Sequence, residues 1–399
     1  MGFSLKRSYD RHTSTLATRG NGNNYTSRDL TCLVFYELET NIKVKVAVVN
    51  SSPSIYNLAV HRIANYHRQQ GDEVTIINGR GFFLPEVWSA NKYYFSCIFT
   101  YDLPDMVIGV NLIRERGIEV EIGGPAATAI PQYIVEQTGL IPKCGLDERF
   151  EYVKGKFFAT FTSRGCPRNC DFCLVPRLEG RKMIEYSDFP IPVGKNPFVC
   201  DNNILATSWE HQEMVVEKLK HVRNIDFNSG FDDRIFIKNP DKYWRLYSQT
   251  KLEAWRFAYD LPEQREPIKA CADFLHDKGV DYRRIIVFCL IGFPGQTFKE
   301  CRERLQYLID IGTSPYPQRY RPLDSLSHSY DPGWLNGDPE MLFGYYGVPF
   351  IWRSCTWEEF KRKYKPIKKE VNELEIRSWQ APFPWNDGED LEGVWTSTQ

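Results

Sequence analysis

Three cysteines near the middle of the chain have the residue type and spacing to do chemistry. Cys166, Cys170 and Cys173 are separated by three and then two residues. Cysteine thiolates hold iron–sulfur clusters, and a complete four-iron cluster normally takes four of them. Three thiolates from one loop can ligate three irons and leave the fourth open to a small chelating molecule. The spacing therefore predicts a four-iron, four-sulfur (4Fe–4S) cluster with one open iron.

Other uses of three neighbouring cysteines need ligands that the surrounding sequence lacks. A structural zinc site takes four ligands, and only the distant Cys144 and Cys200 could supply a fourth sulfur on either side. No histidine lies between His67 and His211. A cluster that only transfers electrons would also want a fourth cysteine nearby, and buried apolar cysteines would not gather in one loop. A catalytic cluster is therefore favoured.

The spacing of apolar residues around this loop predicts the strands and helices that position it. From residue 157 onward, apolar segments alternate with helical ones, and the helices at 263–278 and 297–310 carry apolar stripes at helical spacing. The expected strands are 157–163, 197–201, 224–230, 254–260, 284–291 and 316–321. Six such units predict a partial (β/α)6 barrel over residues 150–323, with its chemistry at the carboxyl ends of the strands.

A second alternation precedes the cysteine loop. The pattern predicts strands at 42–50, 73–78, 96–101 and 119–122, and helices at 58–70 and 107–116. Strands that alternate with helices form a parallel sheet covered on both faces. The segment 42–145 is therefore expected to be a doubly wound, flavodoxin-like α/β domain. Residues 1–41 are expected to be a disordered tail, and 324–399 a C-terminal extension with a helix at 356–378.

The segment Cys166-Pro-Arg-Asn-Cys170-Asp-Phe-Cys173 resembles the signature of the radical S-adenosylmethionine (SAM) superfamily, and the resemblance extends over residues 157–322. In that superfamily the open iron binds the amino and carboxylate groups of SAM. The resemblance implies that one electron from the cluster breaks a sulfur–carbon bond of SAM. The resulting 5′-deoxyadenosyl radical then removes a hydrogen atom from a substrate. A one-electron reductant, such as a flavodoxin or a ferredoxin, is implied as partner.

The resemblance also assigns residues to SAM itself. Phe172 matches the aromatic position beside the adenine, and Gly292 lies on a glycine-containing strand whose backbone is expected against the adenine. Asp201 and Asn203 end the second strand, where the superfamily places a polar group for the amino end of SAM. The Asp-Asn-Asn turn departs from the common Gly-Gly-Glu pattern and looks more like an Asp-containing variant. These four residues are the expected cofactor contacts, and no catalytic side chain is assigned.

The N-terminal domain resembles the cobalamin-binding domain that precedes many radical SAM barrels, chiefly in the turn Gly123-Gly124-Pro125. The DxHxxG motif that often supplies a histidine ligand to cobalt is missing, and His61 and His67 fall within a predicted helix. Some relatives keep the fold without the cofactor, and others bind cobalamin without a histidine. Cobalamin therefore stays an open question.

Two other functions remain as alternatives. Methylthiotransferases that modify tRNA carry three further cysteines in an N-terminal domain; Cys32, Cys97 and Cys144 are available, but their positions along the chain argue against convergence. A non-catalytic iron–sulfur or regulatory protein is the other alternative. It would have no use for the polar groups that follow several of the predicted strands.

Composition narrows the setting. The 50 Lys and Arg residues balance 51 Asp and Glu residues, so the overall charge demands neither nucleic acid nor a membrane surface, although nucleic acid is not excluded. No run of 18 apolar residues is present, and the first residues lack the apolar stretch of a secretory signal. Eleven scattered cysteines suit a reducing compartment. We therefore expect a cytoplasmic protein.

Overall fold

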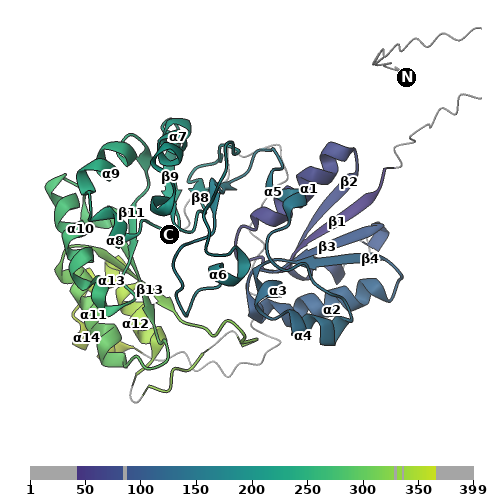
Figure 1. The fold of residues 1–399 in the computed structure, drawn as a ribbon. Coiled ribbons are helices and arrows are strands. Elements are labelled where there is room, and N and C mark those ends of the chain that lie inside the picture. Colours follow the sequence, from purple (N-terminus) through teal and green to yellow (C-terminus); the bar gives the residue numbers. More distant parts are fainter. Residues whose placement is uncertain (1–42, 84–87, 328–329, 335–336, 365–399) are drawn as a thin grey trace, which may run out of the picture. The chain divides into compact units, whose positions relative to one another are not determined.

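The computed structural model describes residues 43–83, 88–327, 330–334 and 337–364, and Figure 1 shows the order of their elements. The expected tail at 1–41 lies outside these ranges, as does the part of the expected C-terminal helix beyond residue 364. Within the described residues, no helix is both long and apolar enough to cross a membrane.

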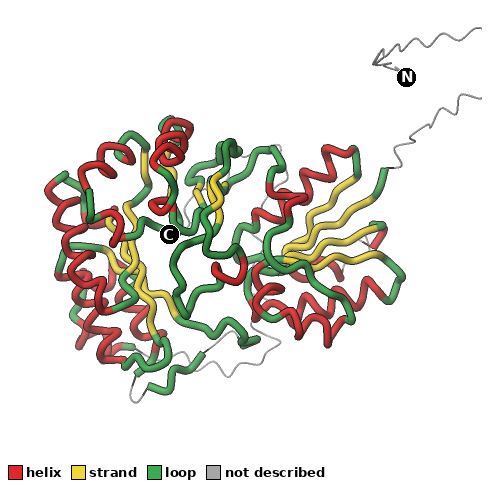
Figure 2. The backbone as a smooth tube through the Cα atoms, in the orientation of Figure 1, coloured by secondary structure: helices red, strands yellow, loops and turns green. Residues whose placement is uncertain are grey.

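The first sheet has four parallel strands in the order β2-β1-β3-β4. Figure 2 shows these strands with helices on both sides. The strands are β1 (Lys45–Asn50), β2 (Glu73–Asn78), β3 (Lys92–Ser96) and β4 (Glu119–Gly123). The helical elements are α1 (Leu58–Gln70), η1 (Gly79–Phe83), η3 (Thr100–Asp102), α2 (Leu103–Arg114), α3 (Pro125–Ala129), α4 (Pro131–Thr138) and α5 (Glu148–Glu151).

Alternate residues of β1 belong to two different cores. Ala47 and Val49 pack in the cluster that includes the apolar face of α2, whereas Val46 and Val48 pack in the cluster that includes α1. Successive side chains of a strand point to opposite faces of a sheet. The sheet is therefore covered on both faces, with α1 on one side and α2 and α4 on the other (Figure 1).

The prediction for the third strand of this sheet is wrong by several residues. The strand is Lys92–Ser96 and not 96–101. The backbone N–H groups of Ile98 and Phe99 donate to the hydroxyl of Ser52, at 3.0 and 3.2 Å, instead of joining a strand. The apolar residues after Ser96 thus form a turn held by a side chain. Helix α2 also begins four residues earlier than expected, with Pro104 in its first turn, a position that suits proline.

Seven further parallel strands form two sheets, of order β10-β9-β8-β5 and β11-β12-β13. They are β5 (Ala159–Thr160), β8 (Phe198–Val199), β9 (Arg223–Phe227), β10 (Lys251–Leu252), β11 (Trp255–Ala258), β12 (Ile285–Ile291) and β13 (Ser314–Arg319). Strands β10 and β11 are separated by only two residues, so one extended stretch of chain pairs first with β9 and then with β12. Proline is tolerated at 315 and 317 because β13 is an edge strand.

Helices follow most of these strands and share one core with them. The apolar stripe expected on α10 is fully buried and consists of Ile268, Cys271, Ala272 and Leu275. On α11 the expected stripe is buried at Cys301, Leu305 and Leu308 and partly covered at Phe298. The helical elements are α6 (Val175–Leu178), η4 (Ile204–Ala206), α7 (Trp209–Leu219), α8 (Asp233–Phe236), α9 (Pro240–Tyr247), η5 (Pro262–Gln264), α10 (Arg265–Asp277), η6 (Tyr282–Arg284), α11 (Phe298–Asp310), α12 (Pro339–Tyr346), α13 (Pro349–Ser354) and α14 (Trp357–Lys363). Parallel sheets with intervening helices make this an α/β protein, as the sequence predicts.

The expected strand 157–163 is divided in two. After the two-residue β5, the chain forms β6 (Ser163–Arg164), which pairs in antiparallel fashion with β7 (Ile184–Glu185). The hairpin between β6 and β7 contains all three cysteines of the motif. The chain therefore leaves the parallel sheet before the first cysteine and returns after the third along β7, which pairs with β6.

The close contact between Gly124, which follows β4, and Cys97, which follows β3, can be tested by substitution. Its φ is +100° and ψ is 173°, a region open almost only to glycine, and a Cβ there would lie 2.5 Å from the carbonyl oxygen of Cys97. We expect Gly124→Ala to lower the free energy of unfolding by roughly 3 kcal/mol or more, because backbone strain and a backbone collision add. Urea titration measures this.

Gly71→Ala is the matched control. Its φ is +89°, and a Cβ would meet nothing within 4 Å. This variant should lose only about 1–2 kcal/mol, the cost of the left-handed backbone. Equal losses in the two variants would show that the contact with Cys97 is not important.

Candidate functional site around the cysteine loop

The cysteine loop begins at the end of β6 and is folded back by its own backbone. The amide of Cys173 donates to the carbonyl of Cys170 at 3.0 Å, and the amide of Cys166 donates to the carbonyl of Gly180 at 3.3 Å. All three thiols are partly buried. Residues 180–182 therefore lie against the first residues of the loop.

The thiols influence one another electrostatically. Burial raises the pKa of both Cys170 and Cys173, and the neighbouring cysteines raise it further, whereas Arg234 opposes the rise at Cys170. Because a metal binds thiolates, loading this loop with metal would release protons. Three thiols of one loop are the donor kind that iron–sulfur clusters take.

The side chains are not, however, assembled around a metal position. Among the described residues, no set of three or more His, Cys, Asp or Glu side chains is arranged to hold an ion. Ligation by Cys166, Cys170 and Cys173 thus stays a prediction that rests on their type, their spacing and their common loop.

Asp201, expected to contact SAM, faces the strand region before the cysteines. Its carboxylate accepts from the Thr162 amide at 2.6 Å, from the Ser163 hydroxyl at 2.9 Å and from the Thr162 hydroxyl. The Thr162 hydroxyl also meets Nε2 of His211 at 3.1 Å. Burial raises the pKa of Asp201, and these hydrogen bonds oppose the rise. In this arrangement Asp201 holds β6 in place.

Asn203, the other polar residue expected at the amino end of SAM, lies beside the first cysteine. Its Nδ2 donates to Asp232 Oδ2 at 3.0 Å and lies 3.9 Å from Cys166 Sγ. Its Oδ1 is buried and has no hydrogen-bond partner. A buried acceptor without a donor is costly unless something supplies one. This oxygen is therefore suited to receive an N–H from a bound molecule.

Buried ion pairs hold the start of the loop, and sequence reasoning did not find them. Arg164 forms ion pairs with Glu151 at 2.6 Å and with Glu179 at 2.9 Å, and Arg62 of α1 forms another with Glu151 at 2.7 Å. All four side chains are at most 10% exposed. Burial alone would raise the pKa of Glu151, but the two arginines outweigh it and lower the pKa.

Glu179 links three segments. Its second oxygen accepts from the Gly165 amide at 2.9 Å and from Asn202 Nδ2 at 2.6 Å. It thereby connects the residue before Cys166 to the turn at the end of β8. No sequence pattern marks Glu179, because its partners lie 14 and 23 residues away.

A second carboxylate, Asp232, holds the middle of the loop. It forms ion pairs with Arg168, between the first two cysteines, at 2.9 Å and with Arg234 at 3.0 Å. Burial would raise the pKa of Asp232, but both arginines lower it. Glu179 and Asp232 thus each bind the loop directly and also accept a hydrogen bond from one asparagine of the turn after β8.

A cavity of about 240 Å³ lies beside the loop. It includes Cys170 and Phe172, two of the residues expected in the site, and Arg234. Its full lining is Arg168, Asn169, Cys170, Asp171, Phe172, Arg234, Asp260, Leu261, Leu290, Phe293 and Gln296. These residues come from the loop and from the carboxyl ends of successive strands, the edge at which α/β sheets bind ligands.

Aromatic rings form one side of this region. Phe172 and Phe293 meet edge to face with centroids 5.9 Å apart, and Phe293 meets Tyr320 at 4.9 Å. Gly292, the fourth expected contact, is not part of the cavity lining: its φ is +82°, and a Cβ there would lie 3.5 Å from Pro332. The glycine allows the turn that places Phe293 in the cavity.

Both histidines near the first sheet contact aromatic or acidic side chains. His61 stacks on Tyr56 with centroids 4.6 Å apart, and His67 bonds to Asp72 at 2.8 Å and to Tyr94 at 3.1 Å. His67 lies in the last turn of α1, far along the helix from the carboxyl end of β1, whereas His61 lies in the first turn of α1, which follows that end. Cobalamin stays untested.

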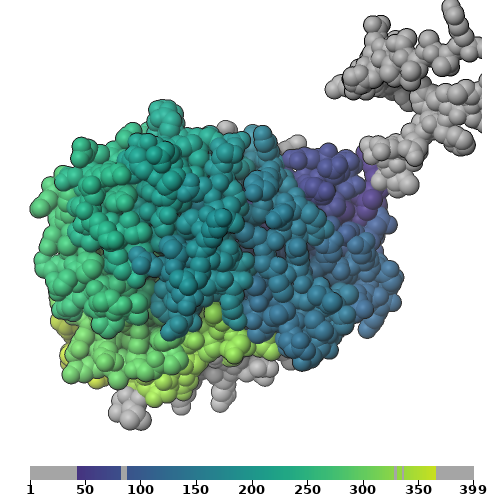
Figure 3. Space-filling model, in the orientation of Figure 1, coloured from purple at the N-terminus to yellow at the C-terminus, as the bar shows by residue number. Residues whose placement is uncertain are grey.

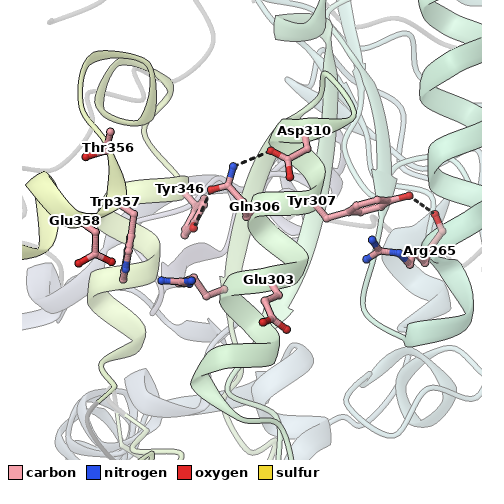
Figure 4. A pocket seen from close by; sticks show the side chains of 10 residues that line it. Arg265, Glu303, Gln306, Tyr307, Asp310, Tyr346, Thr356, Trp357 and Glu358 are labelled. Carbon is pink, nitrogen blue, oxygen red and sulfur yellow. Dashed lines mark hydrogen bonds between the residues drawn. The ribbon is translucent and has the colours of Figure 1, made fainter.

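A larger cavity, of about 560 Å³, lies among the covering helices α10, α11, α12 and α14. Figure 4 shows Gln306 between Tyr346 and Asp310, to which it is hydrogen-bonded, and the hydroxyl of Tyr307 directed at the backbone of Arg265. No cysteine or histidine lines it. Although this cavity is larger, the smaller one contains the residues capable of chemistry, and we take that one as the candidate site.

Comparison with known proteins adds no identification. No family model matches the sequence, and no curated protein matches it. Among solved structures, the Caulobacter myo-inositol binding protein, determined with myo-inositol bound, aligns with 70% of this chain and 82% of its own chain. The sequence identity is 10% and the TM-score 0.19. That similarity is too low to carry a functional argument.

Replacing Glu179 should loosen the loop. Glu179→Gln keeps the side-chain volume but removes the charge opposite the buried Arg164. We expect the free energy of unfolding to fall by about 2–3 kcal/mol, measured by urea titration. We also expect less bound iron after anaerobic reconstitution with iron and sulfide, because the Gly165 end of the loop is released. Glu148→Gln changes an exposed carboxylate and should have little effect; equal behaviour of the two variants would contradict the role of Glu179.

The carboxyl group of Asp233 makes stability depend on pH. It is buried, accepts from Gln264 at 2.9 Å through one oxygen, and has no partner for the other. Burial raises its pKa from 3.8 to about 6, with Asp232 adding to the rise and Arg234 opposing it. A raised carboxyl pKa means that the folded state binds the proton more tightly, so stability falls as pH rises from about 4 to 6 and is level above that.

Asp233→Asn should remove this dependence. At each pH the quantity of interest is the free energy of unfolding of the variant minus that of the natural protein. We expect this difference to be about 1 kcal/mol greater at pH 8 than at pH 5. Urea titrations at the two pH values measure the difference. A difference that is unchanged or smaller at pH 8 would show that Asp233 is not protonated in the folded protein at pH 5.

Proposed function

We propose that this protein is a cytoplasmic radical SAM enzyme. The observation that carries the proposal is the position of the three-cysteine loop, beside a cavity at the carboxyl ends of parallel strands. When bound by Cys166, Cys170 and Cys173, a 4Fe–4S cluster would supply the electron that cleaves SAM to methionine and a 5′-deoxyadenosyl radical.

The strand order supports the finer architecture of this proposal. Strands β5, β8, β9, β10/β11, β12 and β13 follow one another in sequence order, broken only between β10 and β11. A partial (β/α)6 barrel has this order. The order β2-β1-β3-β4 begins like that of flavodoxin-like sheets. We therefore assign 150–323 to a barrel and 42–145 to a doubly wound domain.

The chain's own residues would bind and orient SAM. The unpartnered Oδ1 of Asn203, which is close to Cys166 but outside the cavity lining, would accept from the ammonium group. Arg168 and Arg234 line the cavity beside Asp171 and Asp260, and although both are paired with Asp232, their remaining N–H groups would suit the carboxylate. Phe172 and Phe293 offer apolar ring surface for the adenine. Asp201 acts indirectly, by holding the strand before the loop.

Shielding from water is the remaining task. A reactive radical must be kept away from solvent. Figure 3 shows that side chains fill the space around α6 which the ribbon in Figure 1 leaves open. The substrate is a molecule with an abstractable hydrogen, and a one-electron reductant is the required partner.

The direct test is formation of 5′-deoxyadenosine. After anaerobic reconstitution with iron and sulfide, the protein is incubated with SAM and dithionite, and the product is quantified by mass spectrometry. We expect product from the natural sequence and an at least hundredfold smaller amount from Cys166→Ala, Cys170→Ala and Cys173→Ala, because each loses a metal ligand.

Cys144→Ala is the control, since Cys144 is an exposed thiol outside the loop; it should behave as the natural protein. The proposal is wrong if a protein with a full complement of iron makes no 5′-deoxyadenosine. It is also wrong if the three loop variants retain the activity.

A further inference from the structure

The first residues of the cysteine loop are in contact with a short segment rich in positive charge. The carbonyl of Gly180 accepts from the Cys166 amide at 3.3 Å, and Arg181 donates to the Pro167 carbonyl at 3.3 Å. A Cβ on Gly165 would lie 2.2 Å from the carbonyl oxygen of Lys182. The two stretches of backbone are therefore in direct contact.

Three cations of this segment face solvent without a carboxylate. Arg177, Arg181 and Lys182 are exposed, and in the described part of the chain none of them has an ion-pair partner. The only carboxylate among residues 177–182, Glu179, is buried and committed to Arg164. Ile184, which follows on β7, is 42% exposed and pairs with Arg164 across the hairpin. We call Arg177, Arg181, Lys182 and Ile184 the basic face.

The basic face and the cavity share no residue and adjoin different parts of the loop. The cavity takes its lining from residues 168–172 and from strand ends, whereas the basic face touches residues 165–167. A molecule bound at the basic face would thus leave the cavity free. Such a molecule would still lie close to the first cysteine, because the Cys166 amide is hydrogen-bonded to the Gly180 carbonyl of the same segment.

We propose that the basic face is the docking surface for an acidic one-electron donor, a reduced flavin protein of the flavodoxin type. This inference rests on the proposed function. In the transfer, the flavin of the donor is oxidised by one electron and the iron–sulfur centre held by the loop is reduced by one. Exposed cations steer an acidic partner to its target. A few charges around one apolar residue suit the small, short-lived interfaces of redox partners.

The alternative occupant is a nucleic acid. Binding along a phosphate backbone uses an extended run of cations, whereas the basic face has three and is bounded in sequence by the exposed carboxylates Asp171 and Glu185. A patch of that size suits a small protein interface. The contact with the cysteine loop also has no purpose for a nucleic acid. The small size of the basic face and its contact with the loop therefore favour the electron donor.

The test reverses two charges and spares the third. Because Arg181 also holds the Pro167 carbonyl, the variant is Arg177→Glu/Lys182→Glu. Its control is Arg223→Glu/Lys251→Glu, which changes the charge equally. Arg223 and Lys251 are exposed and pair with each other at the start of β9 and β10, and these amino ends lie at the edge opposite to the cavity.

Two measurements are made on each full-length protein. Calorimetry gives the Kd for oxidised flavodoxin at low and high salt and does not depend on SAM chemistry. Product analysis gives the rate of 5′-deoxyadenosine formation with reduced flavodoxin or with dithionite. We expect the variant to bind flavodoxin about tenfold more weakly at low salt, with a smaller dependence on salt. We expect its flavodoxin-driven rate to fall similarly, and its dithionite-driven rate to be unchanged.

Equal flavodoxin binding by the variant and the control would overturn the docking proposal. So would an equal loss in the dithionite assay, which would place Arg177 and Lys182 in the site itself. A variant that binds flavodoxin normally but loses affinity for a single-stranded oligonucleotide would assign the basic face to nucleic acid. If no protein makes 5′-deoxyadenosine with dithionite, the proposed function fails, and the calorimetry still decides whether the basic face binds the donor.

Discussion

The arrangement of the cysteine loop depends on carboxylates buried beneath it. Arg164 enters the interior just before the first cysteine, and a buried guanidinium is tolerated only where anions meet it. Glu151 and Glu179 provide them, and Arg62 balances the second negative charge. The set of two cations and two anions has no net charge, so its burial costs less than that of any member alone. Removing one carboxylate would leave a charge without compensation.

The turn after β8 connects this buried network to the cysteine loop and to the residues around it. Its three consecutive side chains reach three different segments: Asp201 to Thr162 and Ser163, Asn202 to Glu179, and Asn203 to Asp232. The loop is thus fixed at its start and at its middle by groups that are themselves held. Precise sites are built in this way, with every ligand-bearing segment supported by a second layer of hydrogen bonds.

Sequence reasoning succeeded where information is local. Helix α1 and strand β2 have the predicted bounds, because apolar periodicity and the glycine after α1 define them. The two-residue strands β7 and β10 could not be read, and 157–163 was predicted as one strand where β5 and β6 are separate, since these short strands exist only through pairing with distant segments. The site divides likewise. Spacing pointed to the cysteines, whereas Glu179 and Asp232 are ordinary acidic residues whose importance comes from partners brought near by folding.

The core beneath α1 has a consequence for how the chain unfolds. Val46, Val48 and the apolar face of α1 share one cluster with Phe157 and Ala159, which belong to the start of the second half. Strand β5, at the edge of its sheet, is therefore covered in part by side chains from the first sheet. Separating the two halves would expose apolar surface on both. Heat or denaturant should accordingly melt the first sheet and the strand that leads to the cysteines in a single cooperative transition.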